Sequence, residues 1–285
     1  MTEGSRSKAL RALQDSQRQG DRQELQQDIA IGSVELTHWY TPVGRALAGV
    51  ARSVSAHLGA RAALIVTLII GALIALLFSF LASRVYDAVT ESDGIAGLDE
   101  PLLRAAMRAR SPVLDGLVTG YTDIAGPIGM PILAIAAILM LSLWRKSWTP
   151  AILIAAAGGG SLLMTIAGKD IIARHRPPLI DAVPPYEYSP SFPSGHTLNA
   201  TVIAGVVAYL LILRQQSTRA RVFTITAASV FALTVGASRV FLGHHWFTDV
   251  LAGWALGGAW LAIVITSHRL YLTARRRGAP QTSKG

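Results

Sequence analysis

Six long apolar runs constrain what this chain can fold into. Each run lacks charged residues and histidines and approaches the ~20 residues that an α-helix needs to cross a bilayer. The shorter runs can extend by a turn, because flanking Arg and Lys side chains reach back to the membrane surface. The runs are Ala62–Ser83, Ile124–Trp144, Ser147–Gly168, Thr197–Leu213, Val222–Ser238 and Val250–Ser267. We therefore predict an all-α membrane protein with six transmembrane helices.

The composition supports this fold class. Hydrophobic residues make up 51% of the 285 residues, charged residues make up 15%, and the mean hydropathy is +0.42. These values are too apolar for an ordinary soluble domain. The net charge of +9 would favour nucleic-acid binding in a soluble protein. Here the basic residues are shared among the chain ends, short loops and local clusters, so we predict no nucleic-acid partner. The lack of cysteine excludes disulfides, thiol catalysis and cysteine metal sites.

The polar parts of the chain predict three regions and their orientation. The regions are an N-terminal tail (1–60, partly helical or disordered), a membrane domain (61–270) and a basic C-terminal tail (271–285). Lys and Arg concentrate at Arg145–Lys146, at Arg214–Arg221 and after Arg269, all on the side of the N-terminus. The positive-inside rule makes this side cytoplasmic. We expect a multi-pass plasma-membrane protein with both termini in the cytoplasm.

A short helix is predicted after the first span. Asp99-Glu100 followed by Pro101 is typical of a helix start, with an acidic cap and a proline in the first turn. One apolar face would consist of Leu102, Leu103, Ala106 and Met107. We expect an interfacial helix on the outer membrane surface. A solvated connecting helix is an alternative of equal weight.

Three clusters of basic residues and histidines lie where apolar runs meet loops. They extend from Lys169 to Pro177, from Pro193 to His196 and from Ser238 to Asp249. With six spans, the first follows the third span, the second opens the fourth, and the third joins the fifth to the sixth. All three then fall outside the cytoplasm. We expect them to converge into one extracytoplasmic site.

The residue types in these clusters favour a phosphate. The cations are Lys169, Arg174, Arg176 and Arg239. Arg presents a planar fork to phosphate oxygens, and Lys presents a point charge. Pro193-Ser194-Gly195, at a helix start, adds backbone N–H groups and the Ser194 hydroxyl. A divalent cation would be repelled by these charges, so a His/Asp metal site is disfavoured.

Two histidines and a carboxylate could supply catalysis. His245 and Asp249 are four residues apart, one helical turn. The carboxylate can therefore accept from one ring nitrogen and leave the other free to attack phosphorus. Asp249 would also stabilise the imidazolium that forms. His196 would protonate the departing oxygen, and water would later hydrolyse the phosphohistidine. His244 is a competing nucleophile, with a poorer helical offset from Asp249.

These motifs resemble a known family signature. Lys169-x6-Arg176-Pro177, Pro193-Ser194-Gly195-His196 and Ser238-Arg239-x5-His245-x3-Asp249 are similar, in order and spacing, to the signature of the type 2 phosphatidic acid phosphatase (PAP2) superfamily. The resemblance covers the chain from the second span to the end. It implies a six-helix membrane fold and hydrolysis through a phosphohistidine, without metal or other cofactor. The implied catalytic residues are His245 (nucleophile), Asp249 (its partner) and His196 (general acid). The implied phosphate ligands are Lys169, Arg176, Ser194, Gly195 and Arg239.

The predicted function is hydrolysis of a lipid phosphate or diphosphate whose tail stays in the bilayer. Undecaprenyl pyrophosphate is the first candidate, followed by phosphatidic acid and phosphatidylglycerol phosphate. A phosphotransferase with the same intermediate and a non-catalytic anion-binding or transport protein are the alternatives. The loop from Pro178 to Phe192 could select substrate or only connect two helices. Arg174 and His175 are predicted to be loop or headgroup-facing residues.

Overall fold

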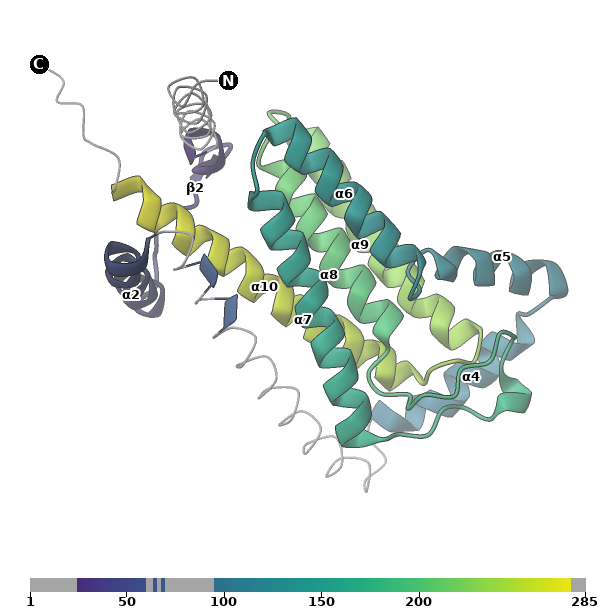
Figure 1. The fold of residues 1–285 in the computed structure, drawn as a ribbon. Coiled ribbons are helices and arrows are strands. Elements are labelled where there is room, and N and C mark those ends of the chain that lie inside the picture. Colours follow the sequence, from purple (N-terminus) through teal and green to yellow (C-terminus); the bar gives the residue numbers. More distant parts are fainter. Residues whose placement is uncertain (1–24, 60–63, 66–67, 70–94, 278–285) are drawn as a thin grey trace, which may run out of the picture.

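The computed structural model describes residues 25–59, 64–65, 68–69 and 95–277, which are mainly helical (Figure 1). Four of the described helices are long and apolar enough to cross a membrane. They are α7 (Thr149–Ile172), α8 (Gly195–Ile212), α9 (Thr218–Phe241) and α10 (Phe247–Arg277). A further apolar helix, α6 (Gly129–Arg145), has 17 residues. The predicted span Ala62–Ser83 lies almost entirely outside the described residues, so the number of six spans stays a prediction.

The helix α6 begins later than the apolar run that predicts it. The run starts at Ile124, whereas residues 124–128 form a turn between α5 (Pro112–Asp123) and α6. In this turn the amide of Gly126 donates to the carbonyl of Asp123 at 3.0 Å. Pro127 has no N–H with which to continue a helix. The chain therefore changes direction before α6 starts.

The helix α8 is central to the bundle and packs against α7, α9 and α10. Its apolar residues face all directions, as expected of a helix enclosed by others. Glycines of α10 allow a close approach. A Cβ at Gly253 would lie 2.9 Å from Cβ of Thr197, and one at Gly257 would lie 2.9 Å from Cβ of Thr201. The start of α8 is thereby held directly beside α10.

Two short α-helices, α4 (Asp99–Arg108) and α5, lie at the end of the bundle where α9 ends and α10 begins (Figure 1). The 3-10 helix η1 (Ile95–Leu98) directly precedes α4. The helix α4 starts at the predicted residue, and Leu103 is buried whereas Leu102 is exposed. Asp99 does not cap the helix as predicted. Its carboxylate instead accepts hydrogen bonds from the backbone N–H and the hydroxyl of Thr248, at 2.8 and 2.7 Å.

The N-terminal segment packs against the C-terminal part of α10 (Figure 1). The strands β1 (Ala30–Ile31) and β2 (Val34–Glu35) form an antiparallel pair and precede α2 (Pro42–Leu58). Ala48 and Ala51 of α2 pack against Leu270 of α10. The helix α10 continues to Arg277, so the predicted C-terminal tail begins as part of a helix.

Candidate active site

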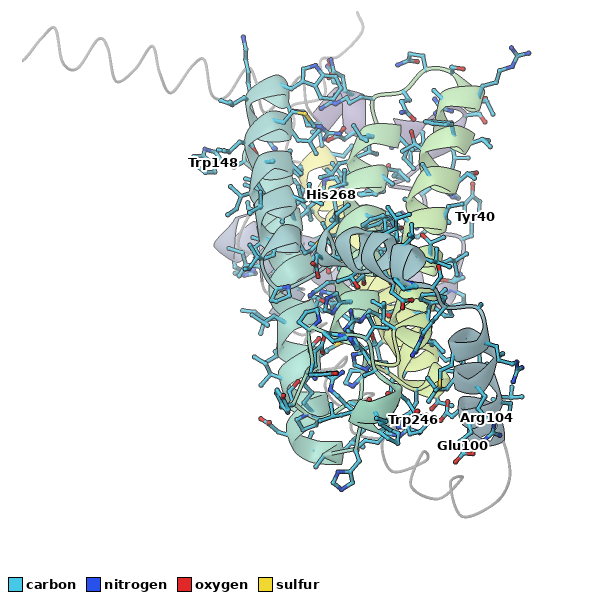
Figure 2. All side chains as sticks on the ribbon, turned by 90° about the vertical axis from the view of Figure 1, so that its right-hand side faces the viewer. Tyr40, Glu100, Arg104, Trp148, Trp246 and His268 are labelled. Atoms are coloured by element: carbon cyan, nitrogen blue, oxygen red, sulfur yellow. The ribbon has the colours of Figure 1, made fainter. Side chains whose placement is uncertain are left out.

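The three predicted clusters meet at one end of the bundle. The end of α7, the start of α8, the end of α9 and the start of α10 lie there, together with the loop 173–194 that contains η2 (Leu179–Asp181). Figure 2 shows Trp246 at this end with Glu100 and Arg104, whereas Trp148 and His268 lie toward the opposite end. The arrangement of the helices therefore brings residues that are far apart in the sequence to the same end of the bundle.

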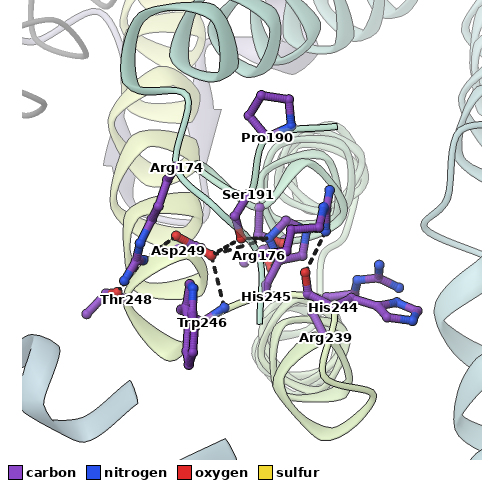
Figure 3. A network of polar contacts seen from close by, with 12 residues as sticks. Arg174, Arg176, Pro190, Ser191, Arg239, His244, His245, Trp246, Thr248 and Asp249 are labelled. Atoms are coloured by element: carbon purple, nitrogen blue, oxygen red, sulfur yellow. Dashed lines mark hydrogen bonds and ion pairs between the residues drawn. The ribbon is translucent and has the colours of Figure 1, made fainter. Parts of the chain in front are cut away.

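His245 and Asp249 form a buried pair (Figure 3). Nδ1 of His245 lies 3.5 Å from Oδ2 of Asp249, and the two side chains are 1% and 0% exposed. The other ring nitrogen, Nε2, lies 3.2 Å from Nη1 of Arg176. This geometry fits a neutral ring whose proton is on Nδ1 and whose Nε2 lone pair faces the guanidinium.

The two adjacent histidines have different surroundings. Burial lowers the pKa of His245 well below the ordinary value of 6.5, and the charges of Arg176 and Arg239 lower it further. The ring of His245 is therefore uncharged at neutral pH. Burial and Arg239 also lower the pKa of His244. However, Nε2 of His244 lies 2.6 Å from the carbonyl oxygen of Val183, to which it can donate. Nδ1 of His244 faces Glu187 at 3.8 Å.

Asp249 is held by several donors besides His245 (Figure 3). Its Oδ2 accepts from the hydroxyl of Ser191 at 2.5 Å and from the backbone N–H of Trp246 at 2.9 Å. Its Oδ1 accepts from Nη1 of Arg174 at 2.5 Å, and Nη2 of Arg174 binds Oδ2 of Asp99 at 2.7 Å. Arg174 lies in the loop after α7, as predicted, but its side chain contacts Asp249 and Asp99 instead of facing the headgroups. It links α4 to Asp249, because its fork reaches both carboxylates.

Arg176 and Arg239 converge on one carboxylate, that of Glu187. Nη2 of Arg176 lies 2.8 Å from Oε2, and Nη2 of Arg239 contacts Oε1. The arginine side chains are 8% and 1% exposed. Burial raises the pKa of Glu187, but the charges of Arg239 and Arg176 outweigh burial and lower the pKa to about 2. Glu187 is therefore ionised at neutral pH.

Lys169 is tied to the same loop as Arg176. Its Nζ donates to the hydroxyl of Ser189 at 2.9 Å and to the carbonyl oxygen of Pro190. Nε of Arg176 donates to the carbonyl oxygen of Ser189 at 2.7 Å. The segment Glu187–Pro190 thus contacts all three cations of the predicted phosphate site.

Ser194, Gly195 and His196 lie at the start of α8 but differ in what they contact. Ser194 is buried, donates its backbone N–H to the carbonyl of Asp249 at 3.1 Å and accepts from the hydroxyl of Thr197 at 2.9 Å. Its backbone donor is therefore already used to join the loop to α10. Gly195 and His196 line the cavity beside the histidine cluster.

That cavity, of about 770 Å³, connects the charged cluster with an apolar groove between α6 and α7. The charged part is lined by Asp123, Lys169, Glu187, His196, Arg239, His244 and His245. The apolar part is lined by Met130, Pro131, Ala134, Ile138, Ile154, Gly158, Gly159 and Leu162. Arg176, Ser194 and Asp249 do not belong to this lining, although Arg176 and Asp249 both contact His245, which does. A ligand with a charged head and an apolar tail fits such a cavity.

Two comparisons decide which family the chain belongs to. The sequence profile of the PAP2 superfamily matches residues 149–271. Phosphatidylglycerophosphatase B of Bacillus subtilis (strain 168) is 34% identical over 180 residues, which are 62% of this chain and 87% of that protein. The chain belongs to the PAP2 superfamily. The comparisons thereby confirm the family that the three motifs predicted.

A solved PAP2 structure has a similar architecture. The crystal structure of a transmembrane PAP2-type phosphatidylglycerolphosphate phosphatase from Bacillus subtilis aligns with a TM-score of 0.59 and 30% identity, over 66% of this chain and 93% of that one. Aquifex aeolicus LpxE aligns over 60% of this chain and 94% of that one, with 24% identity and a TM-score of 0.46. The first alignment supports a multi-pass membrane fold for this PAP2 chain.

Among the residues outside the PAP2 signature, Arg174 contacts Asp249, and Glu187 contacts Arg176 and Arg239. Asp99 binds Arg174 and so supports Asp249 indirectly. Their role does not follow from motif spacing, because they lie on a loop and on a helix that precedes the bundle. A charge argument points to Glu187, since buried arginines need a nearby carboxylate and Glu187 lies between two signature motifs.

Proposed function

We propose that this chain is a membrane lipid phosphatase that hydrolyses the phosphate or diphosphate headgroup of a lipid. The observation that carries the proposal is the single cavity that joins the His/Arg cluster to the apolar groove between α6 and α7. A lipid tail could stay between these helices while its phosphate reaches His245. Two similar proteins are phosphatases of phosphatidylglycerophosphate, which supports the same reaction class.

The reaction proposed has two steps. Nε2 of His245 attacks the terminal phosphorus, the bond from that phosphorus to the leaving oxygen breaks, and protonated His196 donates a proton to that oxygen. The leaving oxygen belongs to the lipid alcohol in a monophosphate and to the remaining lipid phosphate in a diphosphate. Water then attacks the phosphohistidine and releases inorganic phosphate, with His196 accepting the proton. Asp249 holds the proton on Nδ1 of His245 and stabilises the positive charge that develops on the ring, as the carboxylate of a serine-protease triad does.

The cations around His245 would stabilise the transferred group. Arg176, Arg239 and Lys169 carry positive charge in a largely buried site, where such charges stabilise a phosphoryl transition state most effectively. Gly195 can offer a backbone N–H at the start of α8. Ser194 contributes by fixing the loop to α10, which modifies the ligand role that the family signature implies for it. The proposed reaction uses no metal or other cofactor.

His245 is a better nucleophile than His244. Nε2 of His245 has its lone pair directed at Arg176, and Asp249 lies behind Nδ1. Nε2 of His244 is occupied by the carbonyl of Val183. That nitrogen donates to a carbonyl oxygen and not to a carboxylate, so the imidazolium formed by attack from Nδ1 of His244 would be stabilised less than that of His245.

The proposed substrates are phosphatidylglycerol phosphate, phosphatidic acid and undecaprenyl pyrophosphate, with an active site outside the cytoplasm. The activities of the similar proteins support phosphatidylglycerol phosphate as the first to test. The orientation is supported by charge, because Arg145, Arg214 and Arg276 lie at the helix ends away from the site. Both termini would then be cytoplasmic.

The test is phosphate release from a panel of these three purified lipids by the full chain in detergent, with EDTA present. We expect inorganic phosphate without an added acceptor, and none from His245→Ala that remains folded. Phosphate transferred only when an alcohol acceptor is supplied would indicate a phosphotransferase instead. Binding of the lipids without turnover would indicate an anion-binding protein. Loss of activity with EDTA would contradict the metal-independent step.

A further inference from the structure

Glu187 is a largely buried carboxylate that the proposed reaction does not use. It lies on the loop between α7 and α8, and its side chain is 29% exposed. Both of its oxygens are bound by guanidinium groups, Oε2 by Arg176 at 2.8 Å and Oε1 by Arg239. Nδ1 of His244 lies 3.8 Å from Oε1. The carboxylate therefore occupies the centre of a cationic pocket.

The residues that follow Glu187 complete the same arrangement. Ser189 and Pro190 provide the oxygen atoms that bind Nζ of Lys169. The carbonyl and hydroxyl oxygens of Ser189 accept from Arg176 at 2.7 and 3.2 Å. One short segment thus gives an oxygen acceptor to each cation proposed to bind phosphate. A phosphate presents the same kind of acceptors to the same donors.

We infer that Glu187 is an internal ligand of the phosphate site, which the substrate phosphate must displace to reach Arg176 and Arg239. This inference rests on the proposed function, because it takes these arginines as phosphate ligands. It goes further by naming the group that competes with substrate and with the phosphate product. The segment Glu187–Pro190 is then the part of the loop that moves when an anion binds.

Charge explains why such a ligand is needed and why it can be displaced. Arg239 is 1% exposed, and a buried cation without a counter-charge is strongly unfavourable. The Glu187 carboxylate neutralises it while the site holds no substrate. A phosphate monoester carries about two negative charges at neutral pH, as for a phosphorylated side chain. It therefore binds the two arginines more strongly than the single charge of a carboxylate.

The surroundings of Glu187 provide an exit from the pocket. Glu187 lines the cavity, and the neighbouring residues Tyr186 and Tyr188 are 44% and 81% exposed. A displaced carboxylate can thus reach solvent through side-chain rotation and a small loop movement. The return of Glu187 would also help release inorganic phosphate after hydrolysis. Glu187 therefore sets which anions the site retains, favouring dianionic phosphate over singly charged anions.

The test is the dissociation constant of inorganic phosphate, measured by isothermal titration calorimetry on the full chain in detergent. In Glu187→Gln the competing charge is gone, and we expect phosphate to bind about tenfold more tightly or better, which corresponds to ~1.4 kcal/mol. Glu187→Asp keeps the charge on a shorter side chain and should give an intermediate constant. Glu100→Gln is the matched control, since Glu100 pairs with Arg104 on the surface of α4. Its constant should equal that of the unchanged protein.

The outcomes separate this inference from the proposed function. Unchanged or weaker phosphate binding in both Glu187→Gln and Glu187→Asp would overturn the inference. If Arg176→Gln abolishes phosphate binding in the same experiment, the proposed site survives that result. If Arg176→Gln leaves the constant unchanged, phosphate binds elsewhere, and both the site and the inference are wrong.

Discussion

Nη1 of Arg174 lies 2.5 Å from Oδ1 of Asp249, and the same guanidinium binds Asp99 at 2.7 Å. This contact ties the proposed partner of the nucleophile to a helix outside the bundle core. Asp99 also binds the backbone and hydroxyl of Thr248, the residue before Asp249. The position of Asp249 is therefore fixed from both its side chain and its backbone.

Arg174→Ala should lower kcat by about 10- to 100-fold and change KM by less than about twofold, because supporting contacts control the geometry of the reacting groups rather than binding. Arg174→Lys cannot bridge both carboxylates and should restore only part of the rate. The measurement is steady-state hydrolysis of a lipid phosphate by variants that melt near the temperature of the unchanged protein. An unaltered kcat in Arg174→Ala would show that Asp249 needs no such support.

The pH dependence of hydrolysis reports on His245. The ring must be uncharged to attack, and its pKa lies well below 6.5 because of burial and the charges of Arg176 and Arg239. The nucleophile therefore stays active at every pH above this pKa. The fall of kcat/KM toward acid pH, the acid limb of the profile, should accordingly occur below pH 6.5. Arg176→Gln removes one of the charges that lower this pKa, so the limb should move to higher pH. Profiles recorded from about pH 4 to 8 would test this, and a limb at or above 6.5 in the unchanged protein would count against the assignment.

The apolar groove can be tested at Gly159 of α7. This glycine lines the cavity, and an added Cβ would meet nothing within 4 Å, so a larger side chain can enter the groove without disturbing α7. Gly159→Leu should lower kcat/KM for a long-chain lipid phosphate by about tenfold or more. Hydrolysis of a small soluble ester such as p-nitrophenyl phosphate should change little.

Gly258 of α10 provides the matched control. It is exposed, an added Cβ there also meets nothing within 4 Å, and it does not line the cavity. Gly258→Leu should therefore leave both activities unchanged. Equal losses with the long-chain and the soluble substrate in Gly159→Leu would mean that the groove does not hold the lipid tail.

Much of the bundle could be predicted from the sequence because a bilayer admits few alternatives. The apolar runs for α7 to α10 each became a helix, and the signature residues lie at their ends. The start of α6 could not be predicted so well. Ile124 continues the apolar run, yet the turn at Gly126 and Pro127 interrupts the helix before Gly129. The hydropathy of an apolar run does not indicate whether the run contains such a turn.

The site could be predicted as far as its motifs reach. Lys169, Arg176, Arg239 and His245 come together as their spacing suggested, while their catalytic roles stay predictions. Contacts made by residues outside the motifs depend on how α4 and the loop fold back onto the bundle. For that reason the sequence predicted Asp99 to be a helix cap, although its carboxylate accepts hydrogen bonds from Thr248 and Arg174.

A buried charge cluster at the opposite end of the bundle predicts a large effect on stability. The carboxylate of Asp28 is 0% exposed and lies 3.2 Å from Nη1 of Arg145 and 3.3 Å from Nη2 of Arg214. Asp28→Asn removes the charge of the buried carboxylate that both arginines contact and should lower the free energy of unfolding by about 3–5 kcal/mol. Denaturation in detergent, followed by tryptophan fluorescence, measures this change.

The surface pair of Glu100 and Arg104 is the control for Asp28. These side chains are 69% and 59% exposed, so Glu100→Gln should change the free energy of unfolding by less than about 1 kcal/mol. Similar small effects in both variants would show that Asp28 does not join the N-terminal segment to the bundle.

The most direct measurement is the location of the phosphoryl group during turnover. A radiolabelled lipid phosphate is mixed with the full chain, the reaction is quenched in base, and the labelled peptide is identified by mass spectrometry. We predict a base-stable, acid-labile phosphohistidine at His245, which is absent from His245→Ala. Phosphate release without covalent label on the protein, or label on His244 in place of His245, would contradict the account.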